Sequence, residues 1–461
     1  LACQFFSNLS SARTMTESDS KLLELIESAI SHRQEEYEEL KKLCEQLQND
    51  QNKRLIVSSF VIKKKERNDY FDLAIKSDSV VVLNLWKLGL FAAFQKLNLN
   101  NRGISVEIRH NFTISAEMSS NEFEKVSEFL NPLAHKTDCI ESDFMQYFAP
   151  LSAASDPKKD LQEVLKSVLE IQIDWTNQIL ATWERLKENA DQTLSAIYLT
   201  LTDEAAYSTR PDMGQIMLCL YSDVTEDTLL WSVCLKWVLK KLNILTTVIT
   251  ENFTDCIFDV TMKNEDIEAV IELIKPLSQK IRSQEMCLYT VNPQIVSYAS
   301  HLVTRGSMCK VLIHDVKEAY FQPWLDFVRA VEPSRVGYTR LRIGREMEDF
   351  LLPLADLVEE IKISTEELRS ETILPQLTIC EAKVILRRQR CTKLYLEHTK
   401  LSITDAEDLV KYFHHQSLRC LLRCSSEEND FEVQIGEYGI TSLVVPMSGR
   451  YMIIGHATFF V

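Results

Sequence analysis

The chain contains the same stretch of sequence twice, and this repeat limits what it can fold into. The segment KLLELIESAI from Lys21 returns without a gap as DLQEVLKSVL from Asp160, and EKVSEFLNPL from Glu124 returns as EAVIELIKPL from Glu268. A repeated unit of about 140 residues has the size of a domain and is far longer than a solenoid repeat. The pattern therefore predicts two duplicated domains in tandem.

Shorter matches lie between and after these ends. They are KLN at Lys96 and Lys241, NFT at Asn111 and Asn252, and FLNPLA at Phe129 with FLLPLA at Phe350. The last match falls after the second unit, so the end of the unit is predicted to occur a third time in shortened form.

Composition narrows the class of protein. A chain of 461 residues, 45% of them hydrophobic, is long enough for two or three cores. Its formal net charge of -16 disfavours binding to nucleic acid or to anionic lipid. The twelve cysteines are scattered through apolar runs, which indicates reduced packing residues in an intracellular protein, cytoplasmic or nuclear. No apolar stretch reaches about 18 residues, so no membrane span is expected.

Each unit is predicted to begin with helices and to continue as helix and strand. Apolar residues recur at steps of three and four in 20–50 and 160–190, which is typical of one long amphipathic helix or a helical pair. β-Branched runs follow, RLIVSSFVIKKK in one unit and LSAIYLTLTDE in the other, and predict strands. We therefore predict a mixed α+β fold of tandem duplicated units, each a helical head followed by strand–helix, leucine-rich-like segments, with a third, truncated α/β copy.

The boundaries follow from this plan. We expect a disordered leader at 1–19, a first unit at 20–150, a second unit at 156–295 and a C-terminal α/β domain at 296–461. The run SVVVLNLWKLGLF is expected to lead into a short helix that ends at Phe94 and Leu97. Pro132 and Pro276 are expected to end helices, because the residue before a proline disfavours helical angles.

The common motifs of catalysis and cofactor binding are missing. With ten glycines, the sequence contains neither a GxxxxGK[ST] nor a GxGxxG phosphate loop. It also contains no GxSxG, HExxH or CxxC motif and no kinase signature. We therefore predict no catalytic residue, no cofactor and no metal, and a protein that is not an enzyme.

Three local clusters carry reactive or charged side chains, and packing or a solvated surface is the favoured interpretation of each. Metal-ligand types gather at His414, His415, Cys420 and Cys424, but without a common zinc spacing. Cys309 lies between His301 and His314, which is formally compatible with a cysteine nucleophile. A basic patch that could receive an acidic peptide or phosphate comprises Lys383, Arg387, Arg388, Arg390 and Lys393.

Several segments resemble the F-box-associated FTH domain of nematode F-box proteins, in which a strand leads into a helix ending in leucine–x–proline and then into another strand. IFDVTMKNEDIEAVIELIKPLSQKI from Ile257 and YTRLRIGREMEDFLLPLADLVEEIKIS from Tyr338 follow that order, and EAKVILRRQRCTKLYLEHTKLSITDAEDLVKYFHHQSL from Glu381 resembles the later part of the domain. The helices at 20–50 and 160–190 stand where such proteins carry the F-box. The resemblance implies a substrate receptor of an SCF-type ubiquitin ligase, whose head docks on a Skp1-like adaptor while the body captures a target protein.

Two hypotheses of different classes follow. The first is a non-enzymatic protein-interaction molecule whose candidate partner-docking face is Leu22, Leu25, Ile26, Ile30, Leu40 and Leu43, although those side chains could equally cover the neighbouring sheet. The second is an uncharacterised intracellular enzyme, with a cleft between the repeat units that collects His314, Asp315, Glu318 and Cys309.

Overall fold

The structure, a computed structural model, has the mixed α+β fold that the sequence predicts. It describes residues 17–64, 70–99, 104–108, 112–141, 145–148, 156–189, 191–203, 215–244, 247–252, 256–289, 293–303, 308–314, 321–333, 335–339, 347–364, 384–385, 387–388, 390–391, 393–397, 420–425, 431–435, 440–447 and 450–458. The predicted leader lies mostly outside these residues, and the first described helix begins at Glu17.

The first unit starts with a single 33-residue helix, α2 (Glu17–Asn49). The elements that follow it are β1 (Leu55–Val57), β2 (Ser59–Lys64), β3 (Tyr70–Ser77), α3 (Val80–Lys96), β4 (Ile104–Ile108), β5 (Phe112–Ser119), α4 (Ser120–Ala134) and β6 (Thr137–Cys139). Strand β3 was not predicted, because the stretch around it contains many charged residues. Its buried residues, Leu73, Ile75 and Ser77, alternate with Asp72, Ala74 and Lys76, which point to the other face, and the charges among these hide the strand pattern.

The second unit repeats this order of elements. They are α5 (Pro157–Glu188), β7 (Leu194–Asp203), β8 (Gln215–Tyr221), α6 (Thr225–Lys241), β9 (Thr247–Asn252), β10 (Ile257–Lys263), α7 (Asn264–Ser278) and β11 (Ile281–Tyr289). Aligned backbone groups make the same hydrogen bonds. Leu55 N–H donates to the carbonyl of Lys136 and Leu194 N–H to that of Lys280, both over 2.8 Å.

The C-terminal part adds strands to this second unit. Its elements are α8 (Pro293–His301), β12 (Met308–His314), α9 (Phe321–Val331), β13 (Arg335–Thr339), α10 (Leu352–Ala355), β14 (Glu360–Ser364), β15 (Lys393–Glu397), β16 (Cys420–Ser425), β17 (Phe431–Ile435), β18 (Ile440–Met447) and β19 (Arg450–Thr458). Strands β11 to β16 pair in parallel, each with the next, and β16 to β19 pair antiparallel. A helix connects each parallel strand to its neighbour from β11 to β14, as parallel pairing requires.

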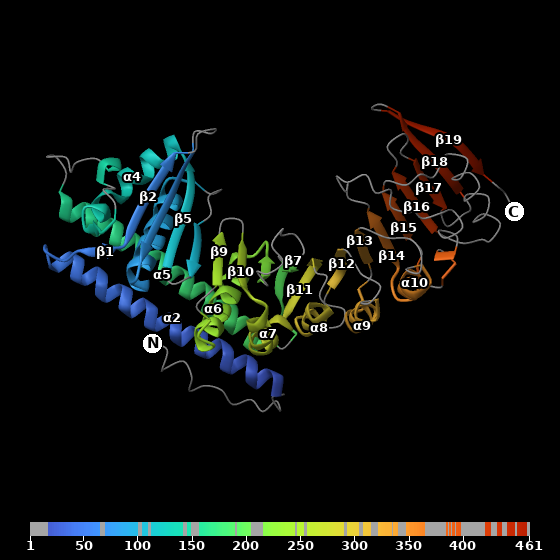
Figure 1. Cartoon of the computed structure of the whole chain (residues 1–461), viewed down its shortest axis with the longest axis horizontal. Coiled ribbons are helices and arrows are strands. Elements are labelled where there is room, and N and C mark those ends of the chain that lie inside the picture. Colours follow the sequence, from blue (N-terminus) through green and yellow to red (C-terminus); the bar gives the residue numbers. More distant parts are fainter. Residues whose placement is uncertain are drawn as a thin grey trace.

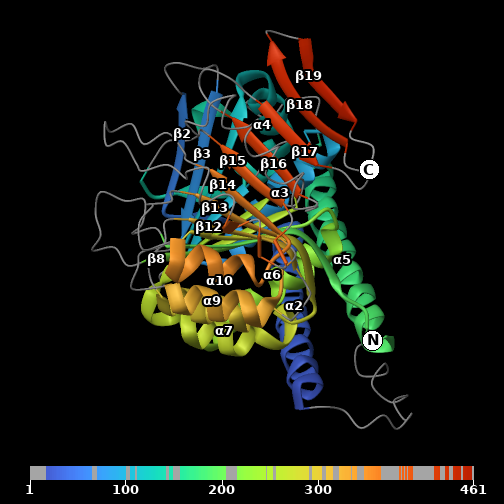
Figure 2. The same cartoon turned by 90° about the vertical axis from the view of Figure 1, so that its right-hand side faces the viewer.

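The strand pairings form one long sheet across the chain. Its order is β2-β3-β5-β4-β9-β10-β8-β7-β11-β12-β13-β14-β15-β16-β17-β18-β19, while β1 and β6 form a separate parallel pair. Figure 1 shows that the sheet is curved and that α6 to α10 lie in a row along one side of it. Figure 2 shows the same helices below the strands. We call the opposite side of β7, β8, β10, β11 and β12, on which no described helix lies, the helix-free face.

Helices α3 and α6 are buried on more than one side because both of their sides are covered. Each contacts its sheet, and α5 packs on both helices. The aligned residues Trp86 and Trp231 are 0% exposed, and within the described residues each indole N–H lacks a hydrogen-bond partner. The short helix predicted to end at Phe94 and Leu97 is a 17-residue helix that ends at Lys96 and includes the whole apolar run. Its length was missed because a helix that is apolar on most sides shows no hydrophobic period. None of the described helices has the length and hydropathy needed to cross a membrane.

The repeated KLN motif closes these two helices. Asn98 and Asn243 both have a φ of 55°, a left-handed conformation that asparagine tolerates better than most residues. The next N–H in each unit bonds back across the helix end, from Leu99 to the carbonyl of Phe94 and from Ile244 to that of Leu239. The motif therefore recurs for a structural reason.

Two details of the sequence interpretation are corrected. Pro132 and Pro276 do not stop α4 and α7, since each helix continues for two residues beyond its proline, so the proline occupies the last turn. The two NFT motifs are not equivalent in the fold. Asn252 ends β9, whereas β5, the counterpart of β10, begins directly after Asn111.

A serine turn before α3 and α6 is also the same in both units. Ser77 Oγ donates to the carbonyl of Ile56 at 3.0 Å and accepts from Ser79 N–H, and Ser222 Oγ donates to the carbonyl of Ser195 at 2.8 Å and accepts from Val224 N–H. Each hydroxyl therefore ties the start of a helix to a neighbouring strand.

Replacing Ser222 with alanine is expected to lower the free energy of unfolding by about 1–2 kcal/mol, because two backbone groups lose their partner. Ser77→Ala should cost about the same. Chemical unfolding of the full chain measures both, with the exposed Ser297→Ala in α8 as the control. A loss at Ser222 no larger than the control would show that the turn does not contribute.

The two units meet about an approximate two-fold axis. Residues aligned by the repeat face each other there: Ser105 on β4 pairs with Thr250 on β9, and Arg33 Nη2 on α2 donates to Gln172 Oε1 on α5 at 2.7 Å. A position that meets its own counterpart is the mark of an isologous interface. The long helices cross this axis, because α2 packs on α6 and α7 while α5 packs on α3 and α4. Each helical head therefore covers the helices of the other unit.

Candidate recognition face

The predicted docking face on α2 lies inside the protein. Four of its residues are at most 5% exposed, namely Leu22, Leu25, Ile26 and Leu40, and two are half-buried against the core, namely Ile30 and Leu43. They contribute to the packing of α2 on α5, α6 and α7. These side chains therefore cover neighbouring helices, and a partner could reach them only if α2 detached.

The predicted basic patch is only partly described. Arg387 and Arg390 are exposed, and Arg388 Nη1 pairs with Asp356 Oδ2 at 3.4 Å. Lys383 lies outside the described residues, and Lys393 begins β15 with its side chain undescribed. At least one of the five cations is therefore paired within the chain.

The other reactive residues fall largely outside the described part of the chain. His414, His415, Asp315 and Glu318 lie outside it, while Cys309 and His314 on β12 and Cys420 and Cys424 on β16 are placed by their backbone alone. His301 is exposed at the end of α8. Among the side chains that are described, no three histidine, cysteine, aspartate or glutamate residues gather as a metal site requires.

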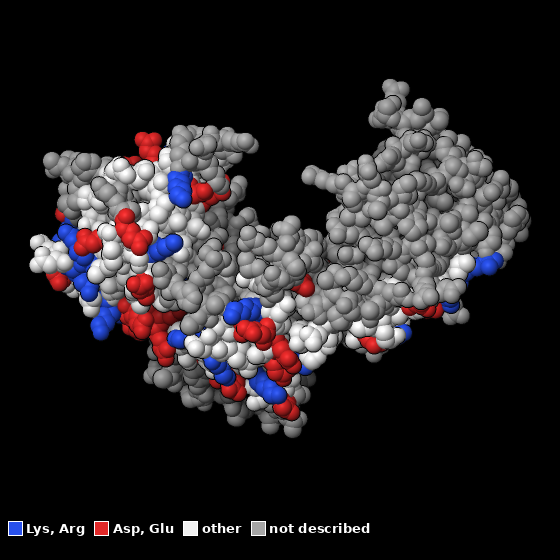
Figure 3. Space-filling view, viewed as in Figure 1, with Lys and Arg blue, Asp and Glu red and all other residues white. Residues whose placement is uncertain are grey.

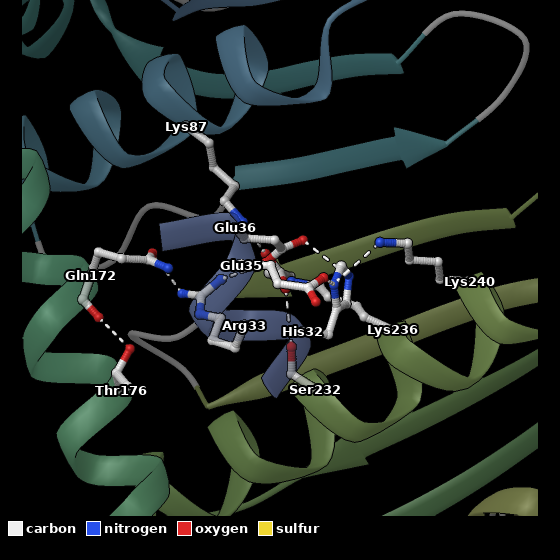
Figure 4. A network of polar contacts seen from close by, with 11 residues as sticks. His32, Arg33, Glu35, Glu36, Lys87, Gln172, Thr176, Ser232, Lys236 and Lys240 are labelled. Atoms are coloured by element: carbon white, nitrogen blue, oxygen red, sulfur yellow. Dashed lines mark hydrogen bonds and ion pairs between the residues drawn. The ribbon is translucent and has the colours of Figure 1, made fainter. Parts of the chain in front are cut away.

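A buried ionic cluster lies at the junction of the units (Figure 4). We use this name for Arg33, Glu36, Lys87, Lys236 and Glu251. The carboxylate of Glu251 is fully buried, accepts from Lys87 Nζ at 3.0 Å and from Ser232 Oγ at 3.1 Å, and also pairs with Lys236. Because Lys87 and Ser232 are aligned positions of the two units, one carboxylate on β9 joins α3 to α6.

Burial shifts the protonation equilibria of this cluster. It lowers the pKa of Lys87 to about 8, with a further contribution from Arg33, and holds the pKa of Lys236 well below its usual range. Burial alone would raise the pKa of Glu36, but the neighbouring cations, Arg33 first, bring it below its ordinary value. Lys87 is 5% exposed, so its amine is closed off from substrates. The cluster is therefore suited to holding the units together.

A groove of about 590 Å³ runs beside this cluster, between α2 and α6. Its α2 side presents Glu27, His32 and Glu35, and its α6 side presents Lys240 and Lys241. Lys240 Nζ lies 3.2 Å from His32 Nδ1. Charges of both signs line the groove and partly pair with each other, so it does not select one class of ligand.

The helix-free face is built by the alternation of side chains along neighbouring strands. On β10 and β8 the side chains that point towards the helices, including Phe258, Val260 and Leu220, are buried. The alternate side chains therefore point to the opposite face. Strand register places these in rows: Tyr221, Tyr198, Glu285 and Lys310 in one, and Asp259, Cys219, Thr200 and Cys287 in the next.

These rows bring together an aromatic pair, an ion pair and a half-buried carboxylate. The rings of Tyr198 and Tyr221 are half-buried, with centroids 4.7 Å apart at an interplanar angle of 32°. Lys310 Nζ pairs with Glu285 Oε2 at 2.8 Å. Burial raises the pKa of Asp259, against the opposing effect of the Cys219 thiol, and its Oδ1 is buried without a hydrogen-bond partner among the described residues.

The two units differ on this face although they share their scaffold. Where Tyr198 pairs with Tyr221 in the second unit, Ser59 pairs with Lys76 in the first. Likewise Ala74 pairs with Ser115 in the first unit where Cys219 pairs with Asp259 in the second. At these positions the aromatic and acidic groups therefore belong to the second unit, and a search for repeated residues passes over them.

The outer surface of the helices carries charges of both signs. In Figure 3 the Asp and Glu side chains of the described residues are interspersed with Lys and Arg over the helices.

Comparison with protein-family models finds no match, and no curated protein and no solved structure is a significant relative of the chain. Function is therefore inferred from the contacts of the chain itself.

Proposed function

We propose that the chain is a non-enzymatic protein-interaction molecule that binds a protein partner on its helix-free face. The observation that carries this proposal is the aromatic, acidic and basic set on that face, at positions where the second unit departs from the first. Curved sheets with helices on one side present an extended surface of this kind to their partners. Tyrosine is also enriched at the energetic centres of protein interfaces.

The alternative, an enzyme with a cleft between the units, has less support. At the junction, β4 pairs with β9 and the buried ionic cluster fills the space between α2, α3 and α6. The junction is thus closed where β4 meets β9 and where the cluster lies. The groove of about 590 Å³ between α2 and α6 is one described opening at the junction, and His314, Asp315, Glu318 and Cys309, the residues expected in the cleft of an enzyme, are not among its described lining residues.

A comparison of retained partners tests the binding proposal. Among the proteins captured by the wild-type full chain, one set should be lost with Tyr221→Ala. The control variant Tyr147→Ala should retain this set, because Tyr147 is an exposed residue of the short 3-10 helix Met145–Tyr147, away from the proposed face. Thermal unfolding confirms that both variants are folded. If Tyr221→Ala retains the same set as wild type, the helix-free face is not the binding surface.

The receptor role in an SCF-type ubiquitin ligase is a more specific form of this proposal. It requires a Skp1-like adaptor to bind away from the buried side of α2, or α2 to move. It predicts stoichiometric co-purification of the full chain with the adaptor. Absence of the adaptor, when a known F-box protein retains it under the same conditions, would remove the ligase role and leave target binding intact.

A further inference from the structure

Asp259 is the residue on the helix-free face that has a buried oxygen with incomplete hydrogen bonding. Its Oδ1 is buried and lacks a donor among the described residues, and a buried acceptor without a donor costs free energy. Its strand neighbours at the same level, Cys219 and Thr250, carry no positive charge. Strand alternation places the described cations Lys310 and Lys263 on this face, and they are paired with Glu285 and Glu265. A positively charged group from outside the chain would therefore supply what Asp259 lacks.

The tyrosine pair lies close enough to act with this carboxylate. Register places Tyr221 two residues from Cys219 on β8, and Cys219 is directly opposite Asp259. Aromatic faces attract cations through their quadrupole, and a nearby carboxylate adds a charge-assisted hydrogen bond. The net charge of -16 also favours the approach of a basic partner.

We propose that this part of the helix-free face binds a lysine or arginine side chain from an extended basic segment of the partner, held between the tyrosine rings and Asp259. The inference rests on the proposed protein-binding function and names the chemistry of its partner. The first unit, with Lys76 and Ser115 at the equivalent positions, lacks this arrangement.

Binding of labelled peptides to the full chain tests the proposal. Three 12-residue probes share a Gly/Ser frame and carry four Arg, four Gln or four Glu residues, and fluorescence anisotropy at physiological salt measures their affinity. The Arg probe should bind most tightly, and Asp259→Asn should weaken it about tenfold. Asp326→Asn, which removes an exposed charge on α9, should change it less than twofold. Tyr221→Phe should retain binding that Tyr221→Leu loses.

Each result has a defined meaning. Equal losses of affinity for Asp259→Asn and Asp326→Asn would show a general attraction to an acidic protein and would overturn the site. The site would also be overturned if the Arg probe did not bind up to about 1 mM, the weak end of specific affinities. If the Gln or Glu probe binds in a way that depends on Tyr221 and not on Asp259, the proposal that the site binds a cationic side chain is overturned. The helix-free face would then remain a binding surface. The proposed function fails separately, when retention of partner proteins does not depend on Tyr221.

Discussion

Replacing Glu251 with glutamine is expected to lower the free energy of unfolding by about 3–5 kcal/mol. The carboxylate is 0% exposed and takes hydrogen bonds or ion pairs from Lys87, Ser232 and Lys236. Without its charge, the amine of Lys87 remains buried beside Arg33 and loses the carboxylate to which it donates, which leaves Glu36 as the anion that acts on it. The loss is large because an uncompensated buried charge costs more than the ion pair itself contributes.

Urea unfolding of the full chain measures this loss, with Glu265→Gln as the matched control. Glu265 lies exposed in the first turn of α7, so its charge should contribute less than about 1 kcal/mol. A double variant, Glu251→Met with Lys87→Met, should be more stable than Glu251→Gln alone, because it removes the charge of Lys87 together with that of Glu251. Equal losses at Glu251 and Glu265 would show that the cluster does not hold the units together.

The sequence predicts the long helices well but not what they cover. The steps between Leu22, Leu25 and Ile26 predict that one side of α2 is buried, and it is. An amphipathic pattern does not say which surface it meets. The crossing of α2 onto α6 and α7 depends on the approximate two-fold axis, which involves contacts between residues more than a hundred positions apart, such as Arg33 and Gln172.

The side chains of the helix-free face could be predicted from the sequence only in part. Tyr198 and Tyr221 lie in segments with strand character, and alternation with Leu199 and Leu220 places them on the less buried side. That the two rings touch, with Asp259 one strand away, follows from register between strands, which local patterns do not fix. The buried charges were missed for another reason, since Glu251 and Arg33 belong to residue types that are usually solvated.

The stability of the chain should rise between about pH 8 and pH 10.5 because of Lys87. Burial lowers the pKa of Lys87 to about 8 in the folded chain, whereas an unfolded lysine titrates near pH 10.4. In this window the unfolded chain holds a proton that the folded chain has released, so the free energy of unfolding increases with pH. Below pH 8 both states are protonated, and the cost of burying the charge is present in full.

Relative to Lys87→Met, the wild-type chain should therefore gain about 3 kcal/mol between pH 8 and pH 10.5. The difference between the two proteins is the quantity to measure, because groups that titrate independently of Lys87 cancel. Lys263→Met, at the exposed end of β10, should give a difference that is flat over the same range. A flat difference for Lys87→Met as well would mean that the amine keeps its proton in the folded chain, with Glu251 compensating its charge more fully than burial opposes it.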